Sequence, residues 1–141
     1  MKKFFFTFLL IPILCSCTGS VASFEFEDYK WNNSSPIEMN FESQKKETKN
    51  LFLDVRSIFG IPYKIISLNF TLVKPNGEQI EFSKELNFNE ENLDCSGDFC
   101  DQKVLILKNL KLEEGKYYLT ISHQKMNIDL YGLMEFRLIE E

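Results

Sequence analysis

The stretch IISLNFTLVKPNGEQIEF, residues 65–82, decides the fold class of this chain. Apolar and polar side chains alternate along its first half, which is the pattern of a strand with one buried face. Pro75-Asn76-Gly77 follows, and Asn-Gly readily adopts the positive φ angles of a tight turn. Ile80 and Phe82 then resume the alternation. The stretch therefore predicts an antiparallel β-hairpin.

The same alternation recurs on both sides of this hairpin, and no segment has a long helical period. Between the alternating segments, residues 43–50 are predicted to form a charged hairpin tip, and residues 87–102 a long acidic loop. Residues 124–131 have room for one helical turn at most. In the last strand Met134, Phe136 and Leu138 are expected to share one face. This pattern is typical of an antiparallel sandwich or barrel, and we predict an all-β fold, a β-sandwich of about seven or eight strands.

The first seventeen residues, MKKFFFTFLLIPILCSC, predict export. Two lysines are followed by an uncharged apolar run of the length of a signal-peptide core, which is too short to span a bilayer comfortably. Leu14-Cys15-Ser16-Cys17 is similar to the bacterial lipobox, in which the peptide is cut before the cysteine and the thiol is acylated. An ordinary secretory signal, cut near Ser20 or Ala22, is the alternative.

The lipobox gives a simple domain plan. Residues 1–16 are the expected signal peptide, residues 17–23 a lipidated tether beginning at Cys17, and residues 24–141 a single β-sandwich domain.

The whole chain has 16 basic and 21 acidic residues, and the signal peptide contains two of the lysines and no acid. The mature chain therefore has 14 basic against 21 acidic residues and a net charge of −7. Nucleic acid is excluded as the main partner, because binding it needs clustered cations. Contact with the membrane is expected through the lipid alone.

The domain plan assigns a role to each of the four cysteines. Cys15 leaves with the signal peptide and Cys17 is acylated, so Cys95 and Cys100 remain. Two nearby cysteines in an exported protein favour a disulfide, because the periplasm is oxidising. A pair of free thiols is the alternative. A zinc site needs about four ligands, and the chain has one histidine, His123, so we expect no metal at these cysteines.

No arrangement of residues predicts catalysis. A Gly-x-Ser-x-Gly elbow and a phosphate-binding glycine loop are both missing from the sequence. A dyad of Cys100 and His123 needs a free thiol. The carboxylates of residues 87–102 do not have the spacing of an EF-hand, and whether this loop binds an ion stays open. We predict that the protein is not an enzyme and has no cofactor and no small-molecule substrate. A hydrolase is the least favoured reading, since it needs two titratable groups converging in a cleft.

Several short motifs follow one another in a recognisable order behind the lipobox. They are Trp31 before Pro36-Ile37, NLFLDVR at 50–56, Ile61-Pro62-Tyr63, Pro75-Asn76-Gly77, Glu114-Gly115-Lys116-Tyr117 and Leu130-Tyr131-Gly132-Leu133. Their order resembles the gliding-motility lipoprotein GldH family of Bacteroidetes. The chain departs from that family at residues 92–100, where a glycine- and tryptophan-rich segment is usual, and at Asn127, where an arginine is usual. The resemblance implies a non-catalytic role in a gliding machinery linked to type IX secretion.

We therefore expect a lipid-anchored envelope protein, in the outer membrane and facing the periplasm, that contacts other proteins of the motility or secretion machinery. Trp31, Arg56 and Tyr63 are the candidate partner-binding residues. Core packing is the structural alternative for Trp31, and a surface ion pair is the alternative for Arg56. A partner interface is predicted to appear as an exposed apolar patch on one sheet face.

The functional alternative is a solute- or glycan-binding lipoprotein of an outer-membrane uptake system. That reading predicts a concave, aromatic-lined pocket that includes Trp31 or Tyr29.

Overall fold

The computed structural model describes residues 20–33, 35–124 and 128–141. They form eleven strands and two short 3-10 helices, η1 (Glu27–Tyr29) and η2 (Glu90–Asn92). The strands are β1 (Ala22–Glu25), β2 (Lys30–Trp31), β3 (Ile37–Ser43), β4 (Glu47–Ile58), β5 (Ile65–Val73), β6 (Gln79–Asn87), β7 (Asp94–Ser96), β8 (Phe99–Leu112), β9 (Gly115–His123), β10 (Leu130–Tyr131) and β11 (Leu133–Glu140). The predicted all-β class is confirmed. The predicted number of strands was too low, because β2, β7 and β10 have only two or three residues each and show no period of their own in sequence.

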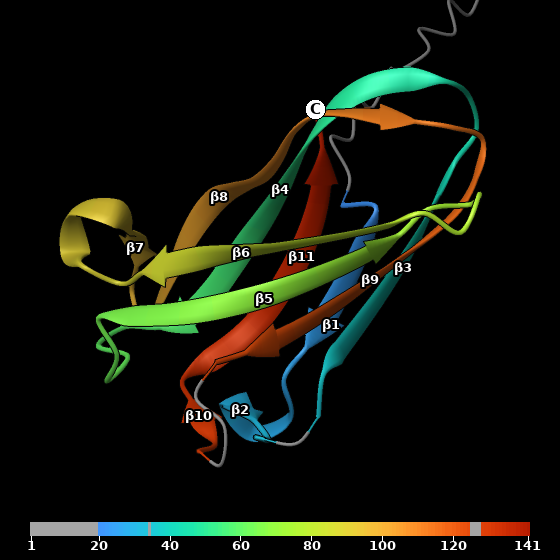
Figure 1. Ribbon diagram of the computed structural model, residues 1–141. Helices are drawn as coiled ribbons and strands as arrows, with labels where there is room; N and C mark the ends of the chain where they lie inside the picture. The colour runs from blue at the N-terminus through green and yellow to red at the C-terminus, as the bar shows by residue number, and fades with distance from the viewer. Residues whose placement is uncertain (1–19, 34, 125–127) are drawn as a thin grey trace, which may run out of the picture.

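The strands form two facing antiparallel sheets and a small ribbon (Figure 1). One sheet has five strands in the order β1-β11-β4-β8-β7, and the other has four in the order β3-β9-β5-β6. β10 and β2 pair as a separate two-stranded ribbon. Consecutive long strands often lie in different sheets, so most connections cross from one sheet to the other.

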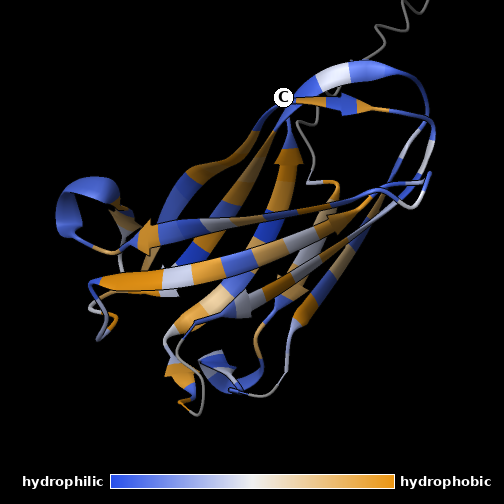
Figure 2. Cartoon of the chain, viewed as in Figure 1, coloured by the Kyte–Doolittle hydropathy of each residue, from blue (hydrophilic) through white to orange (hydrophobic). Residues whose placement is uncertain are grey.

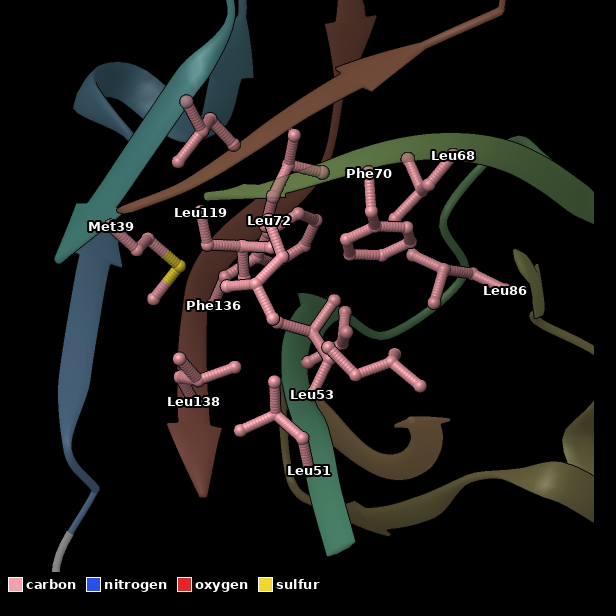
Figure 3. Packing of buried hydrophobic residues seen from close by; sticks show 14 of the residues in the cluster. Met39, Leu51, Leu53, Leu68, Phe70, Leu72, Leu86, Leu119, Phe136 and Leu138 are labelled. Atoms are coloured by element: carbon pink, nitrogen blue, oxygen red, sulfur yellow. The ribbon is translucent and has the colours of Figure 1, made fainter. Parts of the chain in front are cut away.

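Hydrophobic side chains from the two sheets meet in one core. Alternating hydrophobic and hydrophilic bands run along the long strands in Figure 2. The hydrophobic side of each strand faces the opposite sheet, where Leu53, Phe70 and Phe136 lie among the buried residues labelled in Figure 3. Removing these apolar surfaces from water is the main force that holds the sheets together.

The stretch that indicated the fold forms a regular hairpin. β5 and β6 pair without interruption from Ile65 and Asn87 to Val73 and Gln79. The turn is closed by hydrogen bonds from the Gly77 N–H to the Lys74 carbonyl and from the Lys74 N–H to the Glu78 carbonyl. Gly77 has a φ of 86°, the left-handed conformation that Asn-Gly turns require.

Local predictions were wrong at three places. The predicted tip at residues 43–50 is only the turn 44–46, because Glu47 already pairs with β8. The predicted loop at 87–102 contains η2, β7 and the start of β8. In β11 a register shift between Leu133 and Glu135 places Leu133 in the core and leaves Met134 only partly buried.

Two other predicted segments, the stretch 124–131 and the start of the domain, can also be compared with the structure. Of residues 124–131, predicted to hold at most one helical turn, 125–127 lie outside the described residues, and Leu130–Tyr131 form β10. β1 begins at Ala22, two residues before the predicted start of the domain.

The connections give the sandwich two unlike ends (Figure 1). At one end lie the short turns 44–46, 74–78 and 113–114. The first described residues and the C-terminus lie at this same end, where the Val21 N–H donates to the Leu138 carbonyl and the Asn50 N–H to the Glu141 carbonyl. We call it the terminal end. The opposite end, which we call the loop end, is formed by the longer connections 26–36, 59–64, 88–98 and 124–132.

Candidate functional site

The exposed apolar side chains gather at the loop end. Eight large hydrophobic residues are exposed in the described part of the chain, and five lie in or beside the loop-end connections: Tyr29, Phe59, Ile65, Ile128 and Tyr131. Figure 2 shows hydrophobic colouring there on the connection between β4 and β5. The outer sheet faces carry isolated residues, Leu105 on one and Tyr118 on the other. The exposed apolar patch predicted on one sheet face, the expected mark of a partner interface, is therefore not found on the outer faces of the described sheets.

Tyr29 is presented by a strained segment of backbone. It ends η1 and is 50% exposed. Asp28 and Tyr29 have φ angles of 51° and 54°, a left-handed conformation that costs an L-residue roughly 1–2 kcal/mol. The Tyr29 carbonyl accepts a hydrogen bond from the Gly132 N–H at 2.8 Å. This segment of the chain is therefore fixed against the segment that follows β10.

Tyr131 is the last residue of β10, in the ribbon that β10 forms with β2. It lies beside Tyr29, which ends η1. Tyr131 is 52% exposed, and its backbone N–H donates to the Tyr63 hydroxyl at 3.0 Å. Opposite Tyr131 in the ribbon is Lys30, whose ammonium lies 5.7 Å from the Tyr131 ring centre and 2.8 Å from an Asp129 carboxylate oxygen. The hydrogen bond from Lys30 lowers the pKa of Asp129, with help from the backbone N–H of Asn33. Tyr63, a predicted partner-binding residue, is half-buried, and its hydroxyl holds the backbone of Tyr131.

Phe59 completes the exposed aromatic group and joins it to the disulfide hairpin. It is 60% exposed, and its backbone N–H donates to the Asp98 carbonyl at 2.8 Å. Asp98 belongs to the turn between β7 and β8, which the Cys95–Cys100 disulfide closes. The structure thus contains the predicted disulfide. Cys100 is buried, so the bridge also fixes the hairpin to the core.

Trp31 lies underneath this surface. Only 3% of it is exposed, and its indole N–H donates to the Ser35 carbonyl at 2.8 Å. Its ring packs edge-on against His123 at 4.8 Å and against Phe136 at 5.7 Å. Trp31 therefore has the core role that sequence analysis gave as the alternative to partner binding.

Arg56 lies on the outer face of the five-stranded sheet in a network of ion pairs. Its guanidinium donates two hydrogen bonds to Asp101, at 2.8 and 3.0 Å, and lies 4.5 Å from the ring centre of Phe99. The hydrogen bond with Asp101 raises the pKa of Arg56. Beside it, Arg137 contacts Asp54 at 2.6 Å. Cross-strand rows on β11, β4 and β8 alternate in charge, as Arg137, Asp54, Lys103 and as Glu135, Arg56, Asp101.

One hollow on the described surface lies beside Trp31 and has a volume of about 490 Å³. Amide and hydroxyl side chains, among them Asn69, Ser122 and Gln124, line it together with Trp31, Pro36 and His123, and most of its exposed lining is apolar.

Trp31 also lines a second hollow of about 300 Å³ together with Phe24 and Phe26. Hollows that include Trp31 are therefore present, as the solute- or glycan-binding alternative predicts, although only 3% of Trp31 is exposed. Tyr29 borders a separate, shallower depression of about 220 Å³ next to Arg56.

Neither a metal centre nor a membrane-spanning helix is found in the described residues. Within them no group of three or more histidine, cysteine or carboxylate side chains is arranged to hold a metal ion. No helix among them is long and apolar enough to cross a membrane. Cys17, the predicted lipid attachment site, and Asn127 lie outside the described residues.

Sequence reasoning missed the exposure of Phe59 and Tyr131 at the loop end. Both are aromatic residues next to a glycine in a connection, in Phe59-Gly60 and Tyr131-Gly132. Connections are usually polar at such positions. An aromatic residue in a turn was therefore the available signal.

Comparison with known proteins gives one informative result. No curated protein matches the chain in sequence. Among solved structures, the chain is similar to an exo-beta-1,3-galactanase from Phanerochaete chrysosporium, with a TM-score of 0.38 and 9% identity over 85% of this chain. The match covers 29% of that enzyme, so the chain spans less than a third of its length. A family model described as GldH lipoprotein matches residues 22–136, most of the described domain, and this chain therefore belongs to the GldH lipoprotein family.

Proposed function

We propose that this protein is a lipid-anchored, non-enzymatic component or accessory of the gliding-motility and type IX secretion-linked machinery, and that it acts through contacts with other envelope proteins. Membership of the GldH lipoprotein family supports the lipid anchor and the link to gliding. The contrast between the two ends of the sandwich is the observation that carries the mode of action. Short turns, the first described residues and the C-terminus occupy one end. Three of the four aromatic residues that are exposed in the described part of the chain, Tyr29, Phe59 and Tyr131, lie at the other.

The proposed anchor is Cys17. It precedes the first described residue, Ser20, by three positions, a span of at most roughly 11 Å. The lipid would therefore hold the terminal end of the sandwich close to the membrane surface. A single acyl chain binds weakly, so durable attachment needs the two or three chains expected on a lipobox cysteine. In this proposal the membrane is the outer membrane and the domain faces the periplasm.

The exposed side chains of the loop end suit binding better than catalysis. Tyr29, Phe59 and Tyr131 have no nucleophile or general base to offer at neutral pH, whereas aromatic side chains dominate the energy of many protein interfaces. They lie at the end of the molecule farthest from the tether. A surface of this kind supports a role in recognition.

The anchor can be tested with two cysteine variants that differ by two positions. Cys17→Ala is expected to abolish acylation and release the protein from the membrane fraction. Cys15→Ala is the matched control and is expected to remain membrane-bound, because Cys15 lies before the predicted cleavage site. The measurement is incorporation of labelled palmitate together with partition of the protein into detergent. Release of the Cys15→Ala protein, or retention of the Cys17→Ala protein, would contradict the assignment.

The machinery can be tested by affinity purification from detergent-solubilised envelopes that contain the full-length lipoprotein. Gliding or type IX secretion components are expected to be recovered with wild type and with Cys15→Ala, and to be depleted with Cys17→Ala. If only subunits of an outer-membrane transporter are recovered, the alternative function in solute or glycan uptake replaces this one.

A further inference from the structure

We propose that Tyr29, Phe59 and Tyr131, which we call the aromatic tip, form a docking surface for a protein that presents lysine or arginine side chains around an apolar centre. This inference rests on the proposed function, because it names where a partner binds and what chemistry the partner offers. It does not depend on the identity of the machinery.

The first argument is that the aromatic tip is held in place before any partner binds. The backbone hydrogen bond from Gly132 to the Tyr29 carbonyl, and the one from Ile58 to the Gly132 carbonyl, join two loop-end connections and the end of β4 at 2.8 Å each. The Tyr63 hydroxyl fixes the Tyr131 backbone, and the Asp98 carbonyl fixes that of Phe59. A backbone that is already fixed loses little conformational entropy on binding, which favours affinity.

The second argument is the strain at Tyr29. Two consecutive residues other than glycine occupy the left-handed region, and the second of them is a half-exposed tyrosine. The strain does not serve to bury Tyr29, which remains in contact with solvent. Strained backbone that presents a side chain to solvent is characteristic of functional sites.

The third argument is the charge around the aromatic tip. The four loop-end connections contain three basic residues, Lys30, Lys64 and Lys125, the last of which lies outside the described residues. They contain seven acidic residues: Glu27, Asp28, Glu90, Glu91, Asp94, Asp98 and Asp129. Lys30 is already paired with Asp129. We call these seven acidic residues the acidic rim, because they belong to the connections that present the aromatic tip. Their excess of negative charge is complementary to a partner with basic residues around an apolar patch, and such complementarity speeds association and selects the partner.

The position of the aromatic tip identifies the partner as a protein rather than the membrane that holds the anchor. β5 has nine residues and spans roughly 30 Å at the usual rise per residue. The aromatic tip therefore lies about one strand length from the terminal end, where the tether enters. Its acidic rim would also be repelled by anionic lipid headgroups.

Photocross-linking in cells tests the docking surface on the full-length lipoprotein. A benzoylphenylalanine replaces Tyr29, Phe59 or Tyr131 in three separate variants, and Tyr118 in a matched control. Tyr118 is also a tyrosine and is 48% exposed, but it lies on the outer face of the four-stranded sheet. A discrete protein adduct is expected from the three tip positions, with a yield about tenfold higher than from position 118.

The charge of the partner is tested on the same adduct. Replacing both Glu90 and Glu91 with lysine is expected to reduce the adduct formed from position 131 by about tenfold, because it reverses part of the acidic rim. Replacing Glu38 and Glu42 with lysine is the control, since these exposed residues lie on β3 and face away from the core. In isolated envelopes, cross-linking is also expected to weaken as the salt concentration rises.

Each outcome supports or overturns the inference. It is overturned if the adduct forms equally well at position 118, if it contains lipid instead of protein, or if the Glu90 and Glu91 reversal leaves its yield unchanged. Protein adducts at position 118 alone would leave the proposed function standing and reject this docking surface. A failure to form protein adducts at all four positions would count against both.

Discussion

At the scale of single residues, Gly132 connects two other segments at the loop end through backbone hydrogen bonds. Its φ is 94°, its N–H donates to the Tyr29 carbonyl, and its own carbonyl accepts from the Ile58 N–H. A Cβ atom at this position would lie 3.0 Å from side-chain atoms of both Ile58 and Ile61. Gly132 is therefore required both for its backbone angle and for the space it leaves.

Gly132→Ala is expected to lower the free energy of unfolding by roughly 2–3 kcal/mol, since it adds crowding to left-handed strain. Gly77→Ala is the matched control: its φ is 86°, but no other heavy atom lies within 4 Å of the added Cβ. This variant should lose only about 1 kcal/mol, from strain alone. The measurement is denaturant unfolding of both variants. Equal losses would show that the space beside Gly132 has no energetic role.

The raised pKa of Glu140 predicts that the free energy of unfolding depends on pH. Desolvation by burial, and then the nearby Glu47, raise the pKa of Glu140 above its usual value of 4.5. The folded protein therefore favours the protonated form, so stability is lost as the pH rises from 4.5 to the folded pKa, and the full loss remains above it. Glu140→Gln is expected to be more stable than wild type at pH 7 and to lose that advantage below pH 4.5.

Urea unfolding at several pH values measures the effect. Glu38→Gln, on the exposed side of β3, should follow wild type throughout. The explanation fails if Glu140→Gln is no more stable than wild type at neutral pH, or if its gain persists unchanged at pH 3.

At the scale of elements, β6 is a long strand with one open edge. It is the last strand of the four-stranded sheet and pairs only with β5 among the described strands. Lys84 lies opposite Leu68, which is fully buried, so it belongs to the core-facing side of β6 although it is exposed. A charge on the core-facing side of an edge strand is a known protection against pairing with another chain.

Lys84→Val is therefore expected to make the protein associate with itself through β6. Light scattering coupled to size exclusion should show oligomers whose fraction rises with protein concentration. Ser83→Val places the same side chain on the outer face and keeps the lysine, so it should elute like wild type. If both variants behave alike, the protection does not come from Lys84.

The elements also show what sequence can and cannot predict. Long strands such as β5 are readable because one face is buried along their whole length, which imposes a period of two. β2 and β10 have two residues each, and they are strands only because Trp31 meets Leu130, a residue far away in sequence. The register shift in β11 likewise arises from pairing with β4. Such features depend on tertiary contacts that no local pattern contains.

The candidate site was predictable only in part for a related reason. The pairing of Cys95 with Cys100 follows from their spacing and the compartment. Exposure does not follow from residue type, since Phe59 is 60% exposed and Phe70 only 1%. Trp31 was a reasonable candidate for contact, yet the fold covers it with Phe26, Phe136 and His123. Its neighbour Tyr29 became exposed instead, because the backbone turns left-handed there.

At the scale of the whole molecule, the two ends of the sandwich determine how it stands on the membrane. β1 begins next to the C-terminal end of β11, so the tether and the C-terminus share the terminal end. The proposed lipid on Cys17 leaves only three residues before the domain. With so short a tether, the loop end should point away from the bilayer.

This orientation can be measured on the lipidated full-length protein in vesicles whose headgroups carry a quencher. A fluorescent amino acid is placed at position 45, 118 or 131, that is, in the turn 44–46 of the terminal end, on the sheet between the ends, and at the aromatic tip. Quenching is expected to be strongest at 45, weaker at 118 and weakest at 131, because the ends are separated by roughly 30 Å. If position 131 is quenched as strongly as position 45, the sandwich lies flat on the membrane. The aromatic tip would then contact lipid, and a protein partner could not bind it as proposed.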